Sequence, residues 1–415
     1  MTMKPCLAIA LALTVLAVAV PTAHSQSVFD KLKSKVKDKA NQTEDNATNS
    51  AVNSADPTNK SAATTNNEAS GSTTATTANA PGAAAGAPGD VATAAAPVTL
   101  LAYQNYDFTP GETIIFADDF STTQDGEFPD QWELTRGQAV VNKAAGYEAF
   151  MLTDGNYARV TPRMKTKIYL PDQFTLEYDL YANPGAYPLQ IEMVSGSDSA
   201  NFHVGGSDAE YNGPVSLGGS LPPQIRGDAF ENKWHHVAVV YRKPQMKIYV
   251  DQYRVLTVPD AKFAPQSLVF EGIGDQEKPI TFRNVRVAAG GGMNMVGKKF
   301  TDAKIVTHGI NFDVDKATLR PESMGTLNQI KAVMASDPTL KFEIDGHTDN
   351  TGTSPHNLAL SQERADAVKA QLVSMGISAD RLTTKGFGDA KPMASNDSPE
   401  GKANNRRVEF VRTSS

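Results

Sequence analysis

Two oppositely charged residues near the end of the chain are suited to form one binding site. Asp349 follows a predicted strand and lies in a turn rich in Asn, Thr and Gly, which exposes side chains and backbone N–H groups. Ser361 is a good N-cap, so Glu363 and Arg364 fall in the first turn of a predicted helix. Arg364 can then stand beside Asp349 at one rim. The pair suits a zwitterionic amino-acid head group, with its ammonium at Asp349 and its carboxylate at Arg364. The alternative is a simple salt bridge within the domain.

Five short segments around these residues form a pattern. They are 312–316 (FDVDK), 346–352 (GHTDNTG), 357–365 (NLALSQERA), 386–388 (GFG) and 404–409 (NNRRVE). In this order and spacing they resemble the OmpA-like peptidoglycan-binding domain, and the resemblance covers the whole C-terminal part of the chain. It implies that Asp349 and Arg364 clamp the diaminopimelate of the peptidoglycan stem peptide, without a cofactor. It also implies a pocket whose walls are Phe312, Asp313, Thr348, Asn357 and Leu360.

Other polar residues of this region receive structural interpretations. Arg406 and Arg407 are expected to tie the last strand to neighbouring carboxylates. His347 precedes the Thr-Asp pair, but one histidine without a second ligand does not predict a metal site. We therefore expect no metal here.

Residues 301–415 alternate between helical and strand patterns. A strand is expected to end at Phe312, and further strands are expected at 342–346 and 406–411. Two helices are predicted, 321–336 and 361–375, because apolar residues recur at helical spacing. The expected buried positions are Met324, Leu327, Ile330 and Met334 in the first helix, and Ala365, Val368, Leu372 and Met375 in the second. This pattern predicts an α/β sandwich.

Residues 98–290 are organised differently, as short strands separated by turns. Segment 174–181 alternates apolar and mostly polar residues, as a half-buried strand does, and 234–242 and 246–250 are two further strands. Many short strands without a convincing amphipathic helix predict an all-β antiparallel sandwich. Segments 233–241 and 246–251 resemble the concanavalin A-like, laminin-G-like family, whose sandwich is jelly-roll-like. The resemblance extends to Asp118, Asp119, Phe120, Gly126, Pro129 and Trp132.

That family includes glycoside hydrolases, so a wall-anchored glycoside hydrolase is the alternative function. Glu177 and Asp179 match the start of an E-x-D-x-x-E strand, but Ala182 stands where the third carboxylate belongs. A glycosidase needs two carboxyl groups at a defined separation, so we expect no enzyme activity. His235 and His236 should lie on opposite faces of one strand and cannot share a ligand. Adjacent acids at 118 and 119 are able to bind calcium, but turn hydrogen bonding is the expected role.

The first part of the chain carries targeting and tether signals. Residues 1–25 are predicted to be a signal peptide, with Lys4, an apolar run at 7–20 and a cleavage site before Gln26. An uncleaved membrane anchor is disfavoured because the run is short. Residues 26–97 begin with a basic segment and continue as an Ala/Thr/Asn-rich tether, predicted to be disordered. A glycine-rich linker is expected at 291–300. The only cysteine, Cys6, lies within the signal peptide.

The net charge of −7 argues against a nucleic-acid partner, which requires a basic surface. The sequence therefore predicts an exported, non-catalytic, multidomain protein on the periplasmic side of the cell outer membrane. Its partner is peptidoglycan, and its β-sandwich is expected to bind a glycan or an envelope protein. A stator-like or lipid-anchored envelope part is the other alternative, but it requires a retained helix or a lipidated cysteine.

Overall fold

The computed structural model describes residues 103, 106–291 and 303–413 of the 415-residue chain. The predicted signal peptide and tether lie outside the described residues, as do positions 292–300 of the predicted linker. All of the described residues fall within one compact unit of the chain. Among them, no helix combines the length and the apolar character needed to span a membrane.

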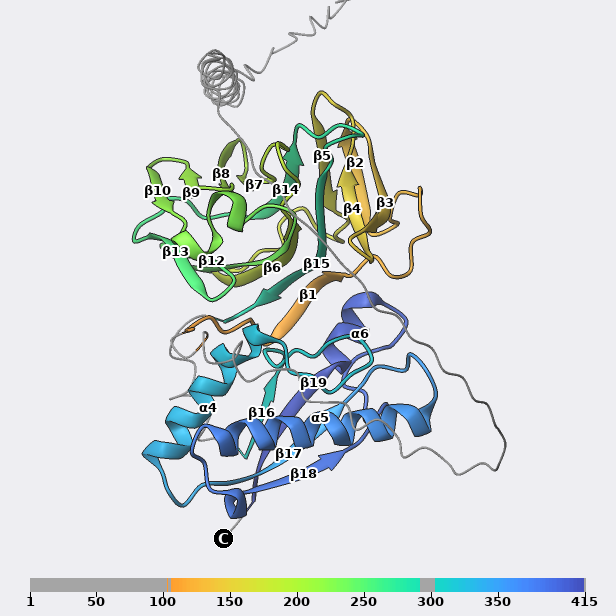
Figure 1. Cartoon of the computed structure of the whole chain (residues 1–415), viewed down its shortest axis with the longest axis vertical. Helices are drawn as coiled ribbons and strands as arrows, with labels where there is room; N and C mark the ends of the chain where they lie inside the picture. The colour runs from red at the N-terminus through yellow and green to blue at the C-terminus, as the bar shows by residue number, and fades with distance from the viewer. Residues whose placement is uncertain (1–102, 104–105, 292–302, 414–415) are drawn as a thin grey trace, which may run out of the picture. The chain divides into compact units, whose positions relative to one another are not determined.

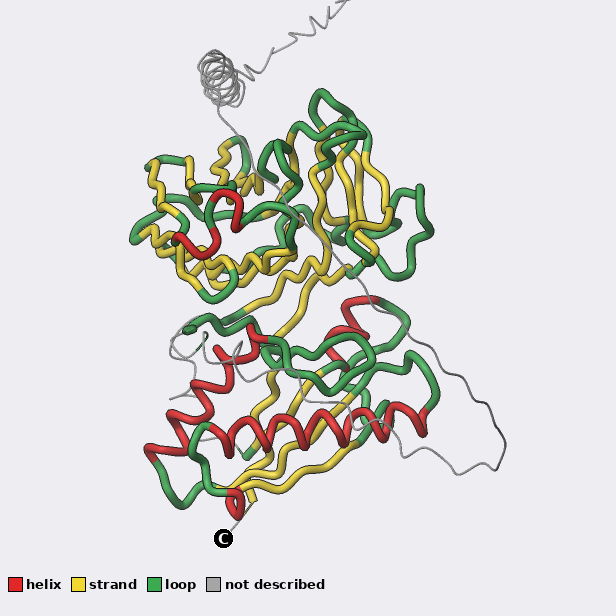
Figure 2. Tube along the Cα trace, viewed as in Figure 1, coloured by secondary structure: helices red, strands yellow, loops and turns green. Residues whose placement is uncertain are grey.

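Residues 106–291 form two antiparallel sheets (Figures 1 and 2). The eight-stranded sheet has the order β13-β12-β11-β6-β15-β4-β3, with β1 paired to β15. Its strands are β1 (Thr113–Asp118), β3 (Ala139–Ala144), β4 (Tyr147–Leu152), β6 (Gln173–Tyr181), β11 (Trp234–Arg242), β12 (Gln245–Val250), β13 (Tyr253–Val258) and β15 (Ile280–Ala289). The seven-stranded sheet has the order β10-β9-β8-β7-β14-β5-β2. Its strands are β2 (Trp132–Arg136), β5 (Ala158–Pro162), β7 (Gln190–Ser195), β8 (Asp198–Val204), β9 (Asp208–Asn212), β10 (Ser216–Ser220) and β14 (Ser267–Gly272).

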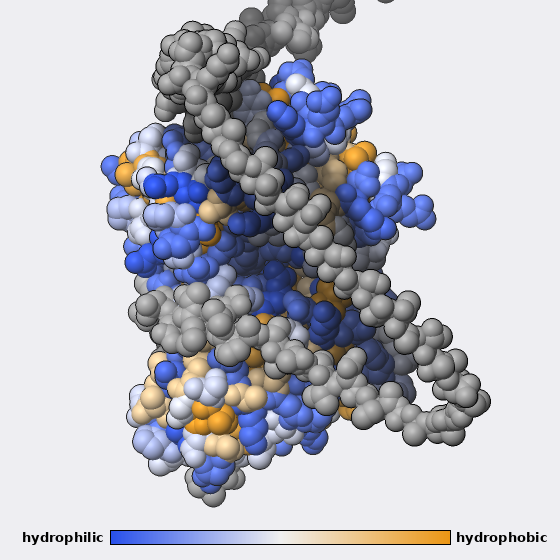
Figure 3. All heavy atoms as spheres, in the orientation of Figure 1, coloured by the Kyte–Doolittle hydropathy of each residue, from blue (hydrophilic) through white to orange (hydrophobic). Residues whose placement is uncertain are grey.

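The two sheets share one apolar core. Strand β6 turns Phe174, Leu176, Tyr178 and Leu180 into this core, because alternate side chains of a strand point to the same face. Trp132 from β2 makes edge-on contact with Phe270 of β14 at 5.1 Å between ring centroids. The face drawn in Figure 3 is mainly hydrophilic, as expected once such side chains are buried. The three predicted strands and the antiparallel sheets are confirmed, whereas the jelly-roll and concanavalin-like assignments stay predictions.

The polar face of β6 is buried as well, so the prediction of a half-buried strand is wrong. Thr175, Glu177 and Asp179 point away from the apolar core, and all three side chains are buried. Glu177 Oε1 lies 2.6 Å from Arg286 Nη2. Asp179 Oδ2 lies 3.5 Å from Nη2 of Arg320, a residue of the C-terminal part of the chain. The strand pattern could not show this burial because the covering cations come from distant parts of the sequence.

These ion pairs also determine the charge of the two carboxylates that resemble a hydrolase motif. Burial opposes ionisation of Glu177, but Arg286 and His236 outweigh it and lower its pKa. Burial likewise opposes ionisation of Asp179, but Arg320 and His236 outweigh it and lower its pKa. A glycosidase acid needs a raised pKa. Both Glu177 and Asp179 have a lowered pKa, so neither is suited to act as that acid.

The two neighbouring histidines do lie on opposite faces of β11. The ring of His235 stacks on Phe230 at 4.1 Å, while His236 Nδ1 lies 3.0 Å from Asp179 Oδ1. Asp118 ends β1, and its carboxylate accepts hydrogen bonds from the Phe120 N–H (2.8 Å) and from Trp132 Nε1 (3.0 Å). The expected turn role of Asp118 is therefore confirmed, at the end of a strand.

Residues 303–413 form an α/β domain, as predicted. Its four-stranded sheet has the order β16-β19-β17-β18, in which only the β17–β18 pair is parallel. The strands are β16 (Lys304–Thr307), β17 (Lys341–His347), β18 (Leu382–Gly386) and β19 (Arg407–Thr413). The helices are α4 (Met324–Ser336), α5 (Ser354–Ser374) and the short α6 (Pro399–Asn405), with η3 (Pro321–Ser323) leading into α4. The predicted positions are buried in both long helices, except that Met375 is only partly buried.

Two predicted boundaries are wrong. The first strand ends at Thr307, and Phe312 forms only an isolated bridge with Leu319. Helix α5 begins at Ser354, because proline is favoured in the first turn of a helix and Pro355 occupies that place. Ser361 is therefore inside the helix, where its Oγ donates to Leu358 O and accepts from the Gly388 N–H.

Candidate functional site

The end of β17 and one face of α5 bring the predicted site residues together. Thr348 and Asp349 directly follow β17. Asn357, Leu360 and Arg364 recur at i, i+3 and i+7 in α5 and so share one face of the helix.

This arrangement requires close contact between β17 and α5. A Cβ atom at Gly346 would lie 2.2 Å from Ser361 O, and one at Gly386 would lie 2.5 Å from Gln362 N. Both glycines therefore allow the strand ends to pack against the middle of the helix.

Asp349 is buried and held in a fixed orientation. Its Oδ1 accepts a 2.8 Å hydrogen bond from the Thr351 N–H, and its Oδ2 lies 2.6 Å from Arg406 Nη1. Asn357 Nδ2 donates to the Asp349 backbone oxygen at 3.3 Å. Burial opposes ionisation of Asp349, but the Thr351 N–H and Arg406 outweigh it and lower its pKa. The side chain is therefore a carboxylate at neutral pH.

Arg364 is held on the other side of the site by backbone oxygens. Its Nε donates to Lys316 O at 2.9 Å, and its Nη2 donates to Asp313 O at 3.5 Å. The guanidinium carbon lies 5.0 Å from the centre of the Phe312 ring, a cation–π arrangement. The contact of Asp313 with Arg364 is made by the Asp313 backbone oxygen. Burial lowers the pKa of Arg364, which still leaves the side chain fully charged at neutral pH.

The structure shows no ion pair between Asp349 and Arg364 within residues 303–413. Asp349 pairs with Arg406 instead. Both Asp349 and Arg406 still influence the pKa of Arg364, so the three charges lie in one region. The alternative of a simple Asp349–Arg364 salt bridge is therefore not what the structure contains.

The remaining predicted pocket residues are buried beside these charges. Leu360 and Asn357 are both buried on α5. The Thr348 N–H donates to Gly388 O at 3.0 Å, while its Oγ1 has no hydrogen-bond partner in the described part of the chain. An unpaired buried hydroxyl costs about 1–3 kcal/mol. This group would gain from a ligand that offers it a partner.

Arg406 and Arg407 divide between two roles. Arg407 is buried, and its Nε donates to Glu409 at 2.7 Å, which is the structural role that we expected. Arg406 also pairs with a carboxylate, but that carboxylate is Asp349, and the Arg406 side chain is 43% exposed. Arg406 is thus a charged site residue that sequence reasoning missed. The signal was its place just before β19, which runs antiparallel to β17 and pairs Arg407 with His347.

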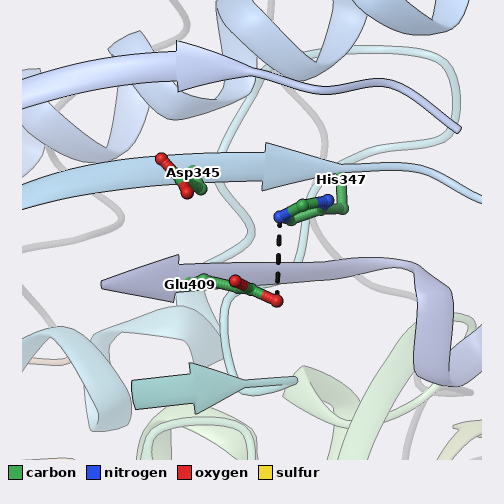
Figure 4. Close-up of side chains that lie close together, drawn as sticks. All are labelled: Asp345, His347 and Glu409. Carbon is green, nitrogen blue, oxygen red and sulfur yellow. Dashed lines mark ion pairs between the residues drawn. The ribbon is translucent and has the colours of Figure 1, made fainter. Parts of the chain in front are cut away.

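A second group of polar residues lies on strands β17 and β19. Asp345, His347 and Glu409 place one possible metal ligand each within 4.8 Å of one another, and Figure 4 shows His347 facing Glu409. The sequence offered His347 no second ligand, whereas the structure places two carboxylates near it. Glu409, however, already pairs with Arg407 and lies 2.8 Å from Lys304 Nζ. These two cations repel a metal ion at this position.

His347 should titrate far below an ordinary histidine. Burial and then Arg407 lower the pKa of His347 to about 4. As the pH falls from about 6.5 to about 4, the unfolded chain takes up a proton here that the folded protein does not. Folding therefore becomes less favourable over this range. The imidazole resonances in an NMR pH titration of the folded protein provide the measurement, and a midpoint near 6.5 would contradict the prediction.

The fold and site define an α/β domain that presents a carboxylate and two guanidinium groups between a strand end and a helix. Residues 311–406 match the OmpA family, so this part of the chain is an OmpA family domain. The probable lipoprotein YiaD of Escherichia coli is 43% identical over 102 residues, which are 25% of this chain and 47% of that protein. The peptidoglycan-binding protein ArfA of Mycobacterium tuberculosis is 43% identical over 102 residues, which are 25% of this chain and 31% of that protein.

Among solved structures, the chain is similar to the peptidoglycan-associated lipoprotein from Burkholderia pseudomallei. The identity is 29%, and the alignment covers 29% of this chain and 98% of that chain with a TM-score of 0.25. The chain spans less than half the length of the two curated relatives above. The family match lies within the C-terminal domain.

Proposed function

We propose that the protein is a non-catalytic component of the bacterial cell envelope that binds peptidoglycan through its OmpA family domain. The observation that carries the proposal is that Asp349 pairs with Arg406 and that both residues lie near enough to Arg364 to influence its pKa. The match of residues 311–406 to the OmpA family and the similarity to a peptidoglycan-binding protein support it.

Diaminopimelate of the stem peptide is the ligand that suits these charges. A carboxylate has about four acceptor positions, and hydrogen bonds from Thr351 and Arg406 use two of those on Asp349. The remaining positions are suited to an ammonium group. Arg364 has about five N–H donors and uses two of them on backbone oxygens, which leaves donors for a carboxylate. Together these groups would hold both charges of a zwitterionic head group.

The remaining parts of the chain suit an envelope location. The predicted signal peptide would export the protein to the periplasm, where peptidoglycan lies, with the outer membrane as the associated membrane. The two-sheet domain would present a further binding surface for a glycan or an envelope protein. Catalysis by Glu177 and Asp179 is not part of the proposal, because cations pair with both carboxylates and lower their pKa.

The test is competition for binding of the full mature protein to purified peptidoglycan that contains diaminopimelate. We expect meso-diaminopimelate to release the protein, because it offers both charges of the head group. Pimelate has the same carbon chain without ammonium groups, and cadaverine has the ammonium groups without carboxylates. Both should fail at equal concentration. Binding that resists diaminopimelate would refute the proposed site, and absence of binding would refute the proposed function.

A further inference from the structure

Residues 311–320 form a loop whose two ends are joined. The Arg320 N–H donates to Asn311 O at 2.9 Å, so the first and last residues of the loop meet at its base. Next to this base, Phe312 forms a bridge with Leu319. Because the ends are joined in this way, a displacement of the base also moves the tip of the loop.

The tip of the 311–320 loop holds the cationic residue of the proposed peptidoglycan site. Arg364 donates from Nε to Lys316 O at 2.9 Å and from Nη2 to Asp313 O at 3.5 Å. Both acceptors are backbone oxygens, so their positions follow the path of the loop. The orientation of the Arg364 guanidinium therefore depends on where the loop lies.

The base of this loop is in contact with two charged residues of the two-sheet domain. Arg286 of β15 donates from Nη1 to His308 O at 2.9 Å, and the same Nη1 lies 3.5 Å from Asn311 Oδ1. Asp179 Oδ2 of β6 lies 3.5 Å from Arg320 Nη2. The two-sheet domain thus contacts the first and the last residue of the loop, through side chains on neighbouring strands.

Both of these side chains have further buried partners within the two-sheet domain. Arg286 donates to Glu177 Oε1 from Nε at 2.9 Å and from Nη2 at 2.6 Å. Asp179 Oδ1 lies 3.0 Å from His236 Nδ1, and its Oδ2 accepts a 2.6 Å hydrogen bond from Asn284 Nδ2. Such bonds restrict each side chain to one geometry. The loop base is therefore held by groups that are themselves fixed.

We propose that Asp179 and Arg286 of the two-sheet domain position Arg364 for binding, because they hold the base of its loop. This role depends on the peptidoglycan binding proposed above, in which Arg364 pairs with a carboxylate of the ligand. Asp179 and Arg286 are positioning residues and do not contact the ligand. Glu177 contributes by orienting Arg286. A loop already held in its binding-competent form does not have to be ordered when the ligand binds.

Two substitutions in the two-sheet domain loosen the loop base in different ways. Asp179→Asn keeps the shape of the side chain but removes the charge opposite Arg320. Arg286→Lys keeps the charge beside Glu177 but loses the fork of N–H donors that reaches the C-terminal domain. Denaturant unfolding curves of the full mature protein show which variants are folded, and if one of them is not, the other decides.

The first measurement is the hydrogen-exchange rate of the Arg364 Nε–H, by NMR of the full mature protein with isotopically labelled arginine. Arg364→Lys identifies the resonance. Exchange requires the Nε–H to leave Lys316 O, so a loosened loop should raise the rate at least about threefold. Retention on purified peptidoglycan that contains diaminopimelate should fall at least about threefold, since affinity follows the fraction of protein in the competent form.

Glu192→Gln is the matched control, because Glu192 is also a buried carboxylate of the two-sheet domain and pairs with Arg159 on the other sheet. It should leave the exchange rate and the retention unchanged. Wild-type exchange in the folded Asp179→Asn and Arg286→Lys variants would overturn the proposal, as would equal acceleration in Glu192→Gln. Faster exchange with unchanged retention would also overturn it. Wild-type protein that is not retained at all would refute the proposed function, while the exchange rates would still decide whether the two-sheet domain holds the loop.

Discussion

Asp349→Ala and Arg364→Ala should each reduce retention of the protein on purified peptidoglycan by at least about tenfold. Each substitution leaves one charged group of the proposed ligand, the zwitterionic head group of diaminopimelate, without its partner on the protein. Truncating one member of a desolvated charge pair typically costs about 2–5 kcal/mol, against about 0–1 kcal/mol for an exposed pair. Each 1.4 kcal/mol corresponds to about a factor of ten in affinity. A pull-down with increasing amounts of peptidoglycan measures the effect.

Arg412→Ala is the matched control, because Arg412 is an exposed arginine on β19 of the same domain. It should bind like the wild type. The Asp349 carboxylate also accepts hydrogen bonds from Thr351 and Arg406. Asp349→Asn is therefore tested beside Asp349→Ala, because asparagine keeps the shape of the side chain and one acceptor oxygen but removes the charge. Wild-type retention by folded Asp349→Ala and Arg364→Ala variants would mean that these charges serve only the domain's own structure.

Sequence periodicity predicted the α/β domain well because its core is made of local patterns. Leu327 and Ile330 in α4, and Val368 and Leu372 in α5, recur at helical spacing and are buried as expected. The start of α5 was predicted at the wrong residue because serine is a favoured N-cap and the prediction assigned Ser361 as that cap. Pro355, which is favoured in the first turn of a helix, marks the true start. The longer helix aligns Asn357 and Leu360 with Arg364 on one face.

Contacts between distant segments could not be predicted in the same way. The polar face of β6 resembles a solvent-facing strand in sequence, and only Arg286 and Arg320 explain its burial. Similarly, the Arg406–Asp349 pair joins the start of β19 to the end of β17. Strand order and register create this contact, and neither follows from the spacing of charges along the chain.

Replacing Arg406 or Arg407 with alanine should lower the free energy of unfolding by very different amounts. Arg407→Ala removes the buried partner of Glu409 and the donor to Asn405 O and Lys391 O. Loss of one partner of a buried ion pair typically costs about 3–5 kcal/mol. Lys304 still pairs with Glu409, so we expect a loss near the lower end of that range.

Arg406→Ala should lower the free energy of unfolding by only about 1 kcal/mol, because the Arg406 side chain is 43% exposed and the Thr351 N–H still donates to the buried Asp349 carboxylate. Urea denaturation of the full chain, followed for the transition of the C-terminal domain, compares the two variants under the same conditions. Equal losses would show that the two arginines share one structural role. A large loss for Arg407→Ala with a small one for Arg406→Ala would separate the arginine that holds β19 in the sheet from the arginine that belongs to the proposed binding site.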